Sequence, residues 1–265
     1  MFSKVLIANR GVAAVRIART LKRLGIASVA LRTSPERGND YFAMFDEVFD
    51  LSGDSVADTY LNIDQILAIA MRAGVGAVHP GYGFLSENEE FAIRVADAGL
   101  AFLGPSPEVI KIFGLKHEAR AIAERQNVPI LRGTDILSDL AAALAAAEQV
   151  GFPLLLKSTA GGGGIGMQRC DNVDQLGAAF DSVTALAQSN FTSPGVFIEK
   201  CITQARHVEV QLFGDGQGNV VILGDRDCSL QRRNQKLVEE CPAPNLPAAI
   251  RISMHKKARA LAASV

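Results

Sequence analysis

The chain has 265 residues, with 27 Lys and Arg against 28 Asp and Glu, and therefore a formal net charge of −1 at pH 7. This balance argues against nucleic acid or an anionic membrane as a partner, and 48% hydrophobic residues argue against disorder. No stretch approaches the roughly 18 uninterrupted apolar residues of a membrane span. Because the four cysteines lack C-x-x-C spacing and the amino terminus lacks a secretory signal, we expect reduced thiols and a cytoplasmic protein.

The first hundred residues alternate short apolar runs with helical patterns. Strands are predicted from the apolar runs at 5–8, 27–31, 48–51, 77–80 and 101–104. Helices are predicted between them, the first with Ala14, Ile17, Ala18 and Leu21 on one face and later ones at 63–73 and 89–98. Strand–helix alternation at this spacing predicts right-handed βαβ units, and therefore a parallel, doubly wound sheet over residues 1–104.

The rest of the chain predicts a different α+β layer with antiparallel strands. Helical patterns at 107–114 and 117–126 suggest a linker over residues 105–127. The predicted elements that follow are a strand at 128–131, a helix at 138–150, a strand at 153–157, a helix at 173–187, and β-like runs at 195–200, 207–214 and 219–224. A turn at 215–218 joins the last two runs as a hairpin. The pattern at 246–265 starts a helix without a stop signal, so we expect the sequence to end inside a domain.

The strongest local signal for chemistry is a lysine followed by a glycine-rich turn, Lys157-Ser158-Thr159-Ala160-Gly161-Gly162-Gly163-Gly164-Ile165-Gly166. A loop nearly free of Cβ atoms lets backbone N–H groups approach phosphate oxygens closely. It is not a Walker A loop, because no Gly-Lys-Ser/Thr follows the glycines. A flexible linker is the plainer interpretation, but a linker rarely lies between a strand-end lysine and a strand that begins with methionine. We therefore favour phosphate binding.

Two further groups of cations are candidates for binding an anion. Lys116 lies where a helix begins, so the helix dipole would add to its charge, although a single lysine there is more often a solvated surface residue. Segment 226–236 carries four cations in eleven residues and could bind a carboxylate, bicarbonate or phosphate, with a basic surface loop as the alternative. His207 and Glu209 alternate along a strand and face one side, yet a lone strand histidine more often packs than catalyses. No set of carboxylates is complete enough to predict a metal site.

These motifs resemble, in order and over essentially all 265 residues, the amino-terminal part of a biotin carboxylase, an ATP-grasp enzyme. The matching segments are KVLIANRG at 4–11, HPGYGFLSEN at 79–88, the glycine loop, FIEK at 197–200, RHVEVQ at 206–211 and RDCSLQRRNQK at 226–236. Ile165 and Asn234 resemble the urea carboxylase branch, also found in urea amidolyase, where acyl-CoA-linked carboxylases usually carry Arg and His. Val12-Ala13-Ala14 departs from the Glu-Ile-Ala that the family usually shows.

The resemblance implies an α/β fold with a Rossmann-like parallel-sheet domain at 1–104, a helical linker at 105–127, and an incomplete α+β ATP-grasp domain. The last would comprise a lid subdomain at 128–204 and the start of a carboxy-terminal lobe at 205–265. It also implies roles for individual residues. ATP would be bound by Lys116, Lys157, Gly163, Gly164, Glu199, Lys200, Cys201, Ile202, His207 and Asn234, with the adenine held largely by backbone groups of 199–202. Lys236 and Gln231 would be catalytic, and Lys236 would bind bicarbonate.

The implied activity is ATP-dependent formation of carboxyphosphate from bicarbonate, followed by carboxylation of biotin on a carrier domain, with Mg²⁺ or Mn²⁺ bound alongside ATP. Partners would be carrier and carboxyltransferase domains or subunits, together with further copies of the chain in a homo-oligomer. The family's metal-binding carboxylates lie beyond position 265, so we expect no metal ligand here and little turnover by this chain alone. The alternatives are a subunit of an acyl-CoA or pyruvate carboxylase, and a truncated, non-catalytic nucleotide-binding fragment.

Overall fold

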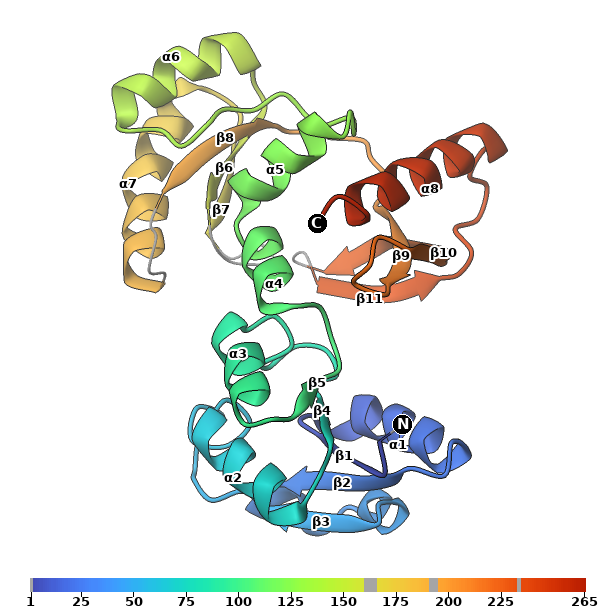
Figure 1. The fold of residues 1–265 in the computed structure, drawn as a ribbon. Coiled ribbons are helices and arrows are strands. Elements are labelled where there is room, and N and C mark those ends of the chain that lie inside the picture. Colours follow the sequence, from blue (N-terminus) through green and yellow to red (C-terminus); the bar gives the residue numbers. More distant parts are fainter. Residues whose placement is uncertain (1, 160–165, 191–194, 233–234) are drawn as a thin grey trace. The chain divides into compact units, whose positions relative to one another are not determined.

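A computed structural model describes residues 2–159, 166–190, 195–232 and 235–265, apart from the side chains of Lys116 and of residues 188–190 (Figure 1). The chain divides into two compact units, Met1–Lys111 and Ile112–Val265. Helix α4 (Pro107–Gly114) spans the division. No helix in the described ranges is long and apolar enough to cross a bilayer.

The first unit contains the predicted parallel sheet, with strand order β3-β2-β1-β4-β5. Its elements are β1 (Lys4–Ile7), α1 (Gly11–Arg23), β2 (Ala27–Arg32), the short 3-10 helices η1 (Ser34–Glu36) and η2 (Asp40–Met44), β3 (Glu47–Asp50), α2 (Ile63–Ala73), β4 (Ala77–His79), α3 (Glu89–Asp97) and β5 (Ala101–Phe102). Helix α1 packs on one face of the sheet, where Val5 and Ile7 meet Ala14, Ala18 and Leu21. Helices α2 and α3 supply buried side chains to the cluster on the other face. The sheet is therefore doubly wound, as the element order predicted.

Asn9 ties together the carboxyl ends of two neighbouring strands of this sheet. It follows β1, is only 4% exposed, and its Nδ2 donates hydrogen bonds of 2.8 Å to the carbonyls of both Pro80 and Tyr82, which follow β4. Gly81 lies between these two carbonyls with φ +67, and a Cβ there would be 2.6 Å from Asn9 Nδ2. The backbone thus passes too close to Asn9 for any side chain at 81. The ANRG and HPGYG segments therefore pack against each other at the carboxyl ends of β1 and β4.

The second unit begins with α5 (Lys116–Arg125) and contains a three-stranded antiparallel sheet of order β7-β6-β8. The elements of this sheet layer are α6 (Leu140–Val150), β6 (Leu154–Ser158), β7 (Met167–Cys170), α7 (Val173–Asn190) and β8 (Val196–Lys200). Side chains of α6 and α7 pack with Leu154, Leu156 and Ile198 in one buried cluster. One face of the sheet is therefore covered by two helices.

The strand predicted at 128–131 is wrong, because these residues form no ladder with any described strand. Pro129 has no N–H group to donate to a neighbouring strand, which disfavours a place within a sheet. The residues that follow instead meet β8 through isolated bridges, from Gly133 to Glu199 and from Leu137 to Val196, and through single backbone hydrogen bonds. This segment is therefore a connection that runs beside β8.

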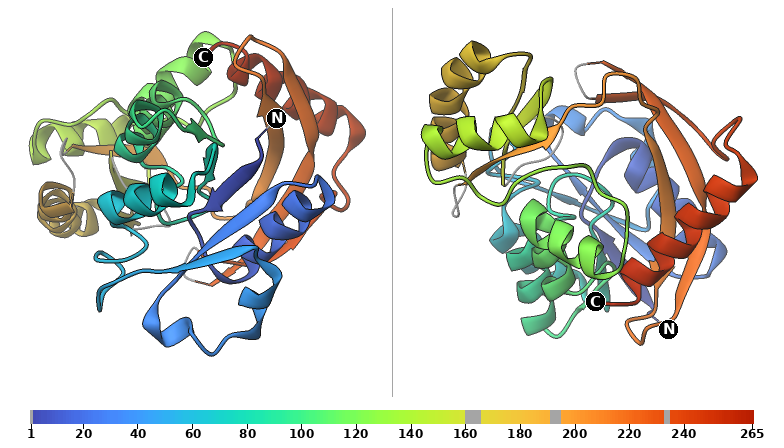
Figure 2. Two further views of the ribbon diagram at one scale, coloured as in Figure 1. Left: turned by 60° about the horizontal axis from the view of Figure 1, so that its bottom comes forward. Right: turned by 90° about the horizontal axis from the view of Figure 1, so that it is seen from above.

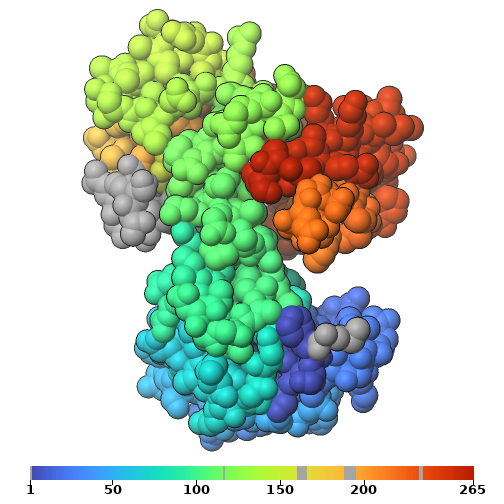
Figure 3. Space-filling view, in the orientation of Figure 1, coloured from blue at the N-terminus to red at the C-terminus, as the bar shows by residue number. Residues whose placement is uncertain are grey.

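A second antiparallel sheet has the order β11-β10-β9 and is made of β9 (Val208–Gly214), β10 (Val220–Arg232) and β11 (Gln235–Glu240). The predicted hairpin turn joins β9 to β10, and the Asp215 carboxylate accepts hydrogen bonds from the backbone of Gln217 and Asn219. Strand β10 is longer than predicted and continues into the basic segment as far as Arg232. Helix α8 (Ala248–Ala262) packs against β9 and β10 (Figure 2) and lies at the surface of its unit (Figure 3).

Asp225 fastens α8 to this sheet. Its side chain is 2% exposed and accepts hydrogen bonds from Arg251 Nε (2.8 Å) and from the backbone N–H of Ala243 (2.8 Å). His255 Nε2 lies 3.0 Å from the same carboxylate. The Arg251 hydrogen bond is the largest of several effects that lower the pKa of Asp225 below its usual value, although burial acts in the opposite direction. The carboxylate is therefore ionised in the folded chain at neutral pH.

The Asp225→Asn substitution is expected to lower the free energy of unfolding at pH 7 by about 1–3 kcal/mol, because charge-assisted hydrogen bonds are lost. A carboxyl whose pKa is lower in the folded chain stabilises it above the unfolded pKa of about 4, and this contribution disappears as pH falls through the folded pKa. The difference between wild type and variant should therefore shrink at acid pH. Urea denaturation across pH measures it, with the exposed Asp181 on α7 changed to Asn as the control. A difference independent of pH would contradict the assignment.

Candidate functional site

Lys157 and Glu199 lie on the face of the β7-β6-β8 sheet that the helices leave uncovered. In β6, Leu154 and Leu156 are buried whereas Leu155 and Lys157 are only partly so, as expected when successive side chains point to opposite faces. Glu199 lies opposite Leu155 in the ladder and is therefore on the same face as Lys157. The Lys157 ammonium forms an ion pair with Glu199 Oε2. The predicted phosphate-binding lysine thus has a carboxylate partner in this structure.

A third residue, Arg120, completes this group. It lies on α5, and its Nη1 donates to Glu199 Oε1 at 2.7 Å, so the two oxygens of one carboxylate have different cationic partners. Arg120 Nη2 also donates to the backbone carbonyl of Leu131 at 3.1 Å. The side chains of Arg120, Lys157 and Glu199 are 18%, 20% and 13% exposed. The formal charge of the three is +1, which suits an anionic ligand.

The segment predicted to hold adenine is joined by hydrogen bonds to the rest of its unit. The Lys200 ammonium donates to the carbonyls of Gly151 (3.0 Å) and Phe152 (2.8 Å), so its charged end is used within the fold. The N–H groups of Lys200 and Cys201 bond to the carbonyls of Arg132 and Pro153. Ile202 is 49% exposed. Adenine binding by backbone groups of 199–202 stays a prediction.

A second polar cluster lies on the β9-β10-β11 sheet around Glu209. Glu209 and Arg226 are direct cross-strand partners, with Arg226 Nε 3.0 Å from Glu209 Oε1. Lys236 Nζ donates to Glu209 Oε2 at 2.5 Å, and Arg226 Nε also lies 3.2 Å from Glu239 Oε2. Burial acts to raise the pKa of Glu209, but the hydrogen bonds from Lys236 and Arg226 outweigh it and lower that pKa. The Glu209 hydrogen bond raises the pKa of Lys236, so this lysine is firmly cationic.

His207 and Gln231 meet beside this cluster. Gln231 is the ladder partner of Lys236, and its Nε2 lies 2.7 Å from His207 Nδ1. The same side-chain amide donates to the Cys228 carbonyl at 2.8 Å. The backbone N–H of His207 donates to Ser229 Oγ at 2.9 Å. The structure therefore brings together three predicted site residues: Gln231 is paired with Lys236 in the ladder, and its side chain contacts that of His207. Four others lie wholly or partly outside the described residues: Gly163, Gly164 and Asn234 entirely, and the side chain of Lys116.

Glu209, Cys228 and Glu239 are a possible set of metal ligands, since one ligand atom from each lies within 4.8 Å of the others. Both carboxylates, however, already form ion pairs with Arg226 and Lys236, and the third ligand is a soft thiol. Mg²⁺ prefers oxygen ligands, so this set does not fit it. That these three residues do not suit Mg²⁺ does not test the prediction that the chain holds no metal ligand.

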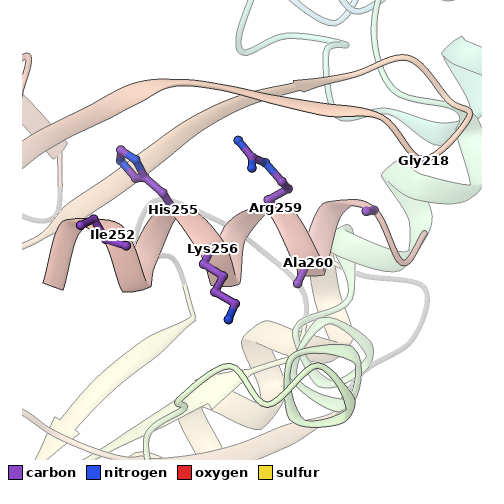
Figure 4. Close-up of a pocket in the computed structure, with 7 residues that line it drawn as sticks. Gly218, Ile252, His255, Lys256, Arg259 and Ala260 are labelled. Atoms are coloured by element: carbon purple, nitrogen blue, oxygen red, sulfur yellow. The ribbon is translucent and has the colours of Figure 1, made fainter. Parts of the chain in front are cut away.

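A hollow of about 530 Å³ lies between α8 and the tip of the β9-β10 hairpin (Figure 4). It is lined by Gly218, Ile252, His255, Lys256, Arg259, Ala260 and Ala263. None of the predicted site residues lines it. His255 and Arg259 point toward the hairpin, whereas Lys256 points to the other side of the helix (Figure 4). The lining also includes no member of the Lys157–Glu199 or Glu209–Lys236 clusters, while its His255 contacts Asp225.

Arg120 and Glu239 were not predicted as site residues. Glu209 was noted in the sequence without a role, and Arg226 only as one of the four cations of segment 226–236. The period-two alternation of β9 places Glu209 and Gln211 on one face, and the predicted hairpin places β9 beside β10. The association of these two side chains with β10 could therefore have been predicted from the sequence. Arg120 carries no such signal, because 79 positions separate it from Glu199.

Matches to two family models agree with this architecture. Residues 1–110 match the biotin carboxylase N-terminal domain, and residues 116–265 match the carbamoyl-phosphate synthase L chain ATP-binding domain. The fold is thus that of an ATP-grasp protein, in which an α/β unit with a parallel sheet precedes antiparallel sheets. The chain belongs to the biotin carboxylase family.

Several known proteins are similar along nearly the whole chain. Urea amidolyase of Saccharomyces cerevisiae is 46% identical over 98% of this chain and 14% of its own length. A biotin carboxylase of Halalkalibacterium halodurans is 46% identical over 95% of this chain and 56% of its own length. The chain therefore spans a fraction of the length of these relatives.

Two solved structures superpose on all of this chain. A Campylobacter jejuni biotin carboxylase in complex with β,γ-ATP has a TM-score of 0.95 and 38% identity, with 59% of that chain covered. The biotin carboxylase domain dimer of Hydrogenobacter thermophilus 2-oxoglutarate carboxylase has a TM-score of 0.93 and 41% identity, with 58% of that chain covered. The latter is in complex with MgADP, ADP and bicarbonate.

Proposed function

We propose that this chain forms part of an ATP-dependent biotin carboxylase module that activates bicarbonate and carboxylates biotin on a carrier, as a component of a urea carboxylase. In the first step a bicarbonate oxygen attacks the γ-phosphorus of ATP, giving carboxyphosphate and ADP. In the second, a nitrogen of biotin bonds to the carboxyl carbon, the bond from that carbon to the phosphate oxygen breaks, and the proton of the nitrogen leaves with the phosphate. The observation that carries the proposal is the grouping of Lys236 and Gln231 on one sheet with His207 directly before β9, in a chain similar to a solved domain that holds MgADP and bicarbonate.

The two clusters suit different parts of this reaction. Lys157 and Arg120 supply an excess of positive charge over Glu199, which suits the phosphates of a nucleotide. Lys236 supplies a fixed cation where negative charge develops on bicarbonate and carboxyphosphate, and Glu209 holds its ammonium in place. Mg²⁺, when bound with ATP, would offset further phosphate charge. We assign no set of ligands for this Mg²⁺ ion among the described residues of the chain.

The remaining assignments are part of the same proposal. The linker at 105–127, the lid at 128–204 and the lobe beginning at 205 are the divisions we propose for the chain after residue 104. Gly163, Gly164 and Asn234 would contact nucleotide, together with Lys116. The module would act in the cytoplasm as a homo-oligomer, with a biotin carrier and a carboxyltransferase as its partners; the similar Hydrogenobacter thermophilus domain is a dimer.

The proposal that urea is the final carboxyl acceptor rests on the residue types at two positions rather than on overall similarity. Identity is 46% both to a urea amidolyase and to a bacterial biotin carboxylase, so it does not choose between acceptors. Ile165 and Asn234 favour the urea branch. An assay with the full set of carrier and carboxyltransferase partners, offered urea, acetyl-CoA or pyruvate, distinguishes the branches. Carboxylation of an acyl-CoA or pyruvate without any of urea would overturn the urea assignment.

Nucleotide binding tests the proposal directly. We expect the Lys157→Ala variant to weaken MgATP binding by about 10- to 100-fold, because a charge-assisted hydrogen bond to phosphate is lost. The Lys116→Ala variant should weaken it less, since Lys157 is fixed at a strand end whereas Lys116 begins a helix. Titration calorimetry measures both, with the exposed Lys256 changed to Ala as the control. Equal affinity in wild type and Lys157→Ala would refute the assignment, and no binding by the wild type would refute the function.

A further inference from the structure

Glu199 is shared between two cations that come from different parts of the second unit. Arg120 on α5 bonds to Oε1 at 2.7 Å, and Lys157 on β6 pairs with Oε2. The Glu199 side chain is only 13% exposed, so water solvates its charge poorly. Leaving such a carboxylate without a partner is costly.

This arrangement bears on what happens when Lys157 binds an anion. To donate to a phosphate, the ammonium must leave Glu199 Oε2 or weaken that contact. If Lys157 were the sole partner, binding would strand a largely buried carboxylate, and the gain on phosphate would be offset by the loss on Glu199. With Arg120 in place, Glu199 keeps one charge-assisted hydrogen bond throughout. The pair Arg120–Glu199 is then neutral, and the charge of Lys157 is available to the ligand.

Arg120 is itself held in place by its surroundings. Its Nη2 donates to the Leu131 carbonyl at 3.1 Å. The next part of that connection passes close by, since a Cβ on Gly133 would lie 2.8 Å from the Ile198 carbonyl oxygen and 3.1 Å from Arg120 Nη2. Arg120 is also four residues after Lys116 in α5 and so lies near the same face of that helix. Through its guanidinium, Arg120 therefore joins helix α5 to β8. This helix begins with Lys116, the other predicted phosphate-binding lysine.

We propose that Arg120 is a positioning residue for nucleotide binding: it retains the Glu199 carboxylate and thereby frees Lys157 for the nucleotide phosphates. This inference rests on the proposed function, because it takes ATP as the ligand of Lys157. It assigns to Arg120 an effect on affinity that acts through Glu199 and Lys157, without contact between Arg120 and the nucleotide.

The test is calorimetric titration of the 265-residue chain with MgATP, using Arg120→Gln, Arg120→Lys, Glu199→Gln and the double variant Arg120→Gln/Glu199→Gln. Arg120→Gln should raise the dissociation constant about 10-fold, and Arg120→Lys should restore part of the loss. The double variant should bind within about 3-fold of Glu199→Gln alone, because no carboxylate is left to hold Lys157. The exposed Arg125, on the same helix, changed to Gln is the matched control and should bind as the wild type does.

Each other outcome has a distinct meaning. Wild-type affinity in Arg120→Gln would overturn the inference and leave the proposed function standing. A loss in Arg120→Gln that Glu199→Gln does not rescue, in step with a fall in melting temperature, would show that Arg120 only stabilises the fold and would also overturn it. Absence of MgATP binding by the wild type would overturn the proposed function, and the inference with it.

Discussion

The Lys236→Met substitution is expected to lower bicarbonate-dependent release of phosphate from ATP by about 100-fold or more. Lys236 is fixed by Glu209 at 2.5 Å and stands in the ladder opposite Gln231, so its charge is preorganised before substrate arrives. Its pKa is raised by the Glu209 hydrogen bond, and it therefore stays protonated through the neutral and mildly alkaline range in which the assay is run. Methionine keeps most of the length of the side chain and removes the charge. Glu209 would retain Arg226 as a partner, so the fold should persist.

Because the chain spans 56% of the Halalkalibacterium halodurans biotin carboxylase, the assay is best run with residues 1–265 joined to the carboxy-terminal region of that relative. Phosphate release is measured with free biotin, bicarbonate and MgATP. Lys256, exposed on α8, is changed to Met as the control and should leave the rate unchanged. If Lys236→Met kept half of the wild-type rate or more, Lys236 would not be the bicarbonate-binding cation.

The sequence predicted the first unit well because its signals are local. Helix α2 was placed at 63–73 with the bounds that the structure has, and both of its ends carry recognisable signals. The Asn62 side chain accepts a hydrogen bond from the Gln65 N–H at the start, and Gly74 takes a left-handed conformation at the end. Apolar runs such as 5–8 lie fully buried in the middle of the sheet, where an uninterrupted hydrophobic strand is expected.

Strand β11 and the second half of β10 were not predicted, because their composition resembles that of a loop. Among the described residues, Arg226, Asp227, Arg232, Lys236 and Glu239 take part in or adjoin strand pairing between 226 and 239. Several of these charges are compensated across strands, as between Arg226 and Glu209, and such pairing depends on register rather than on local composition. A β-sheet stabilised in this way has little hydrophobic alternation for a sequence pattern to show.

Individual residues of the candidate site were predicted from the sequence, but their arrangement in space was not. Lys157 was singled out from its place before the glycine loop, and the structure adds that Glu199 lies on the same face of the sheet. That relation follows from the register of β6 against β8, which the sequence alone does not specify. The approach of Arg120 depends in addition on how α5 docks, and therefore on tertiary packing.

The other large effect is expected at Gly81, where the Gly81→Ala variant should lower the free energy of unfolding of the first unit by about 3 kcal/mol or more. Two causes add. Gly81 has φ +67, which costs an L-residue roughly 1 kcal/mol, and its new Cβ would lie 2.6–3.0 Å from three atoms of Asn9. Asn9 is buried, so it cannot move aside without breaking the hydrogen bonds that join the ends of β1 and β4.

Gly83→Ala is the matched control for this prediction. Gly83 has φ +68, nearly the value at Gly81, but a Cβ there would meet nothing within 4 Å. This variant should therefore show the backbone cost alone, roughly 1 kcal/mol. The chain has no tryptophan, and its three tyrosines, Tyr41, Tyr60 and Tyr82, all belong to the first unit, so tyrosine fluorescence during urea denaturation reports on that unit. Equal losses in the two variants would mean that the approach of Asn9 to Gly81 contributes nothing beyond the backbone conformation.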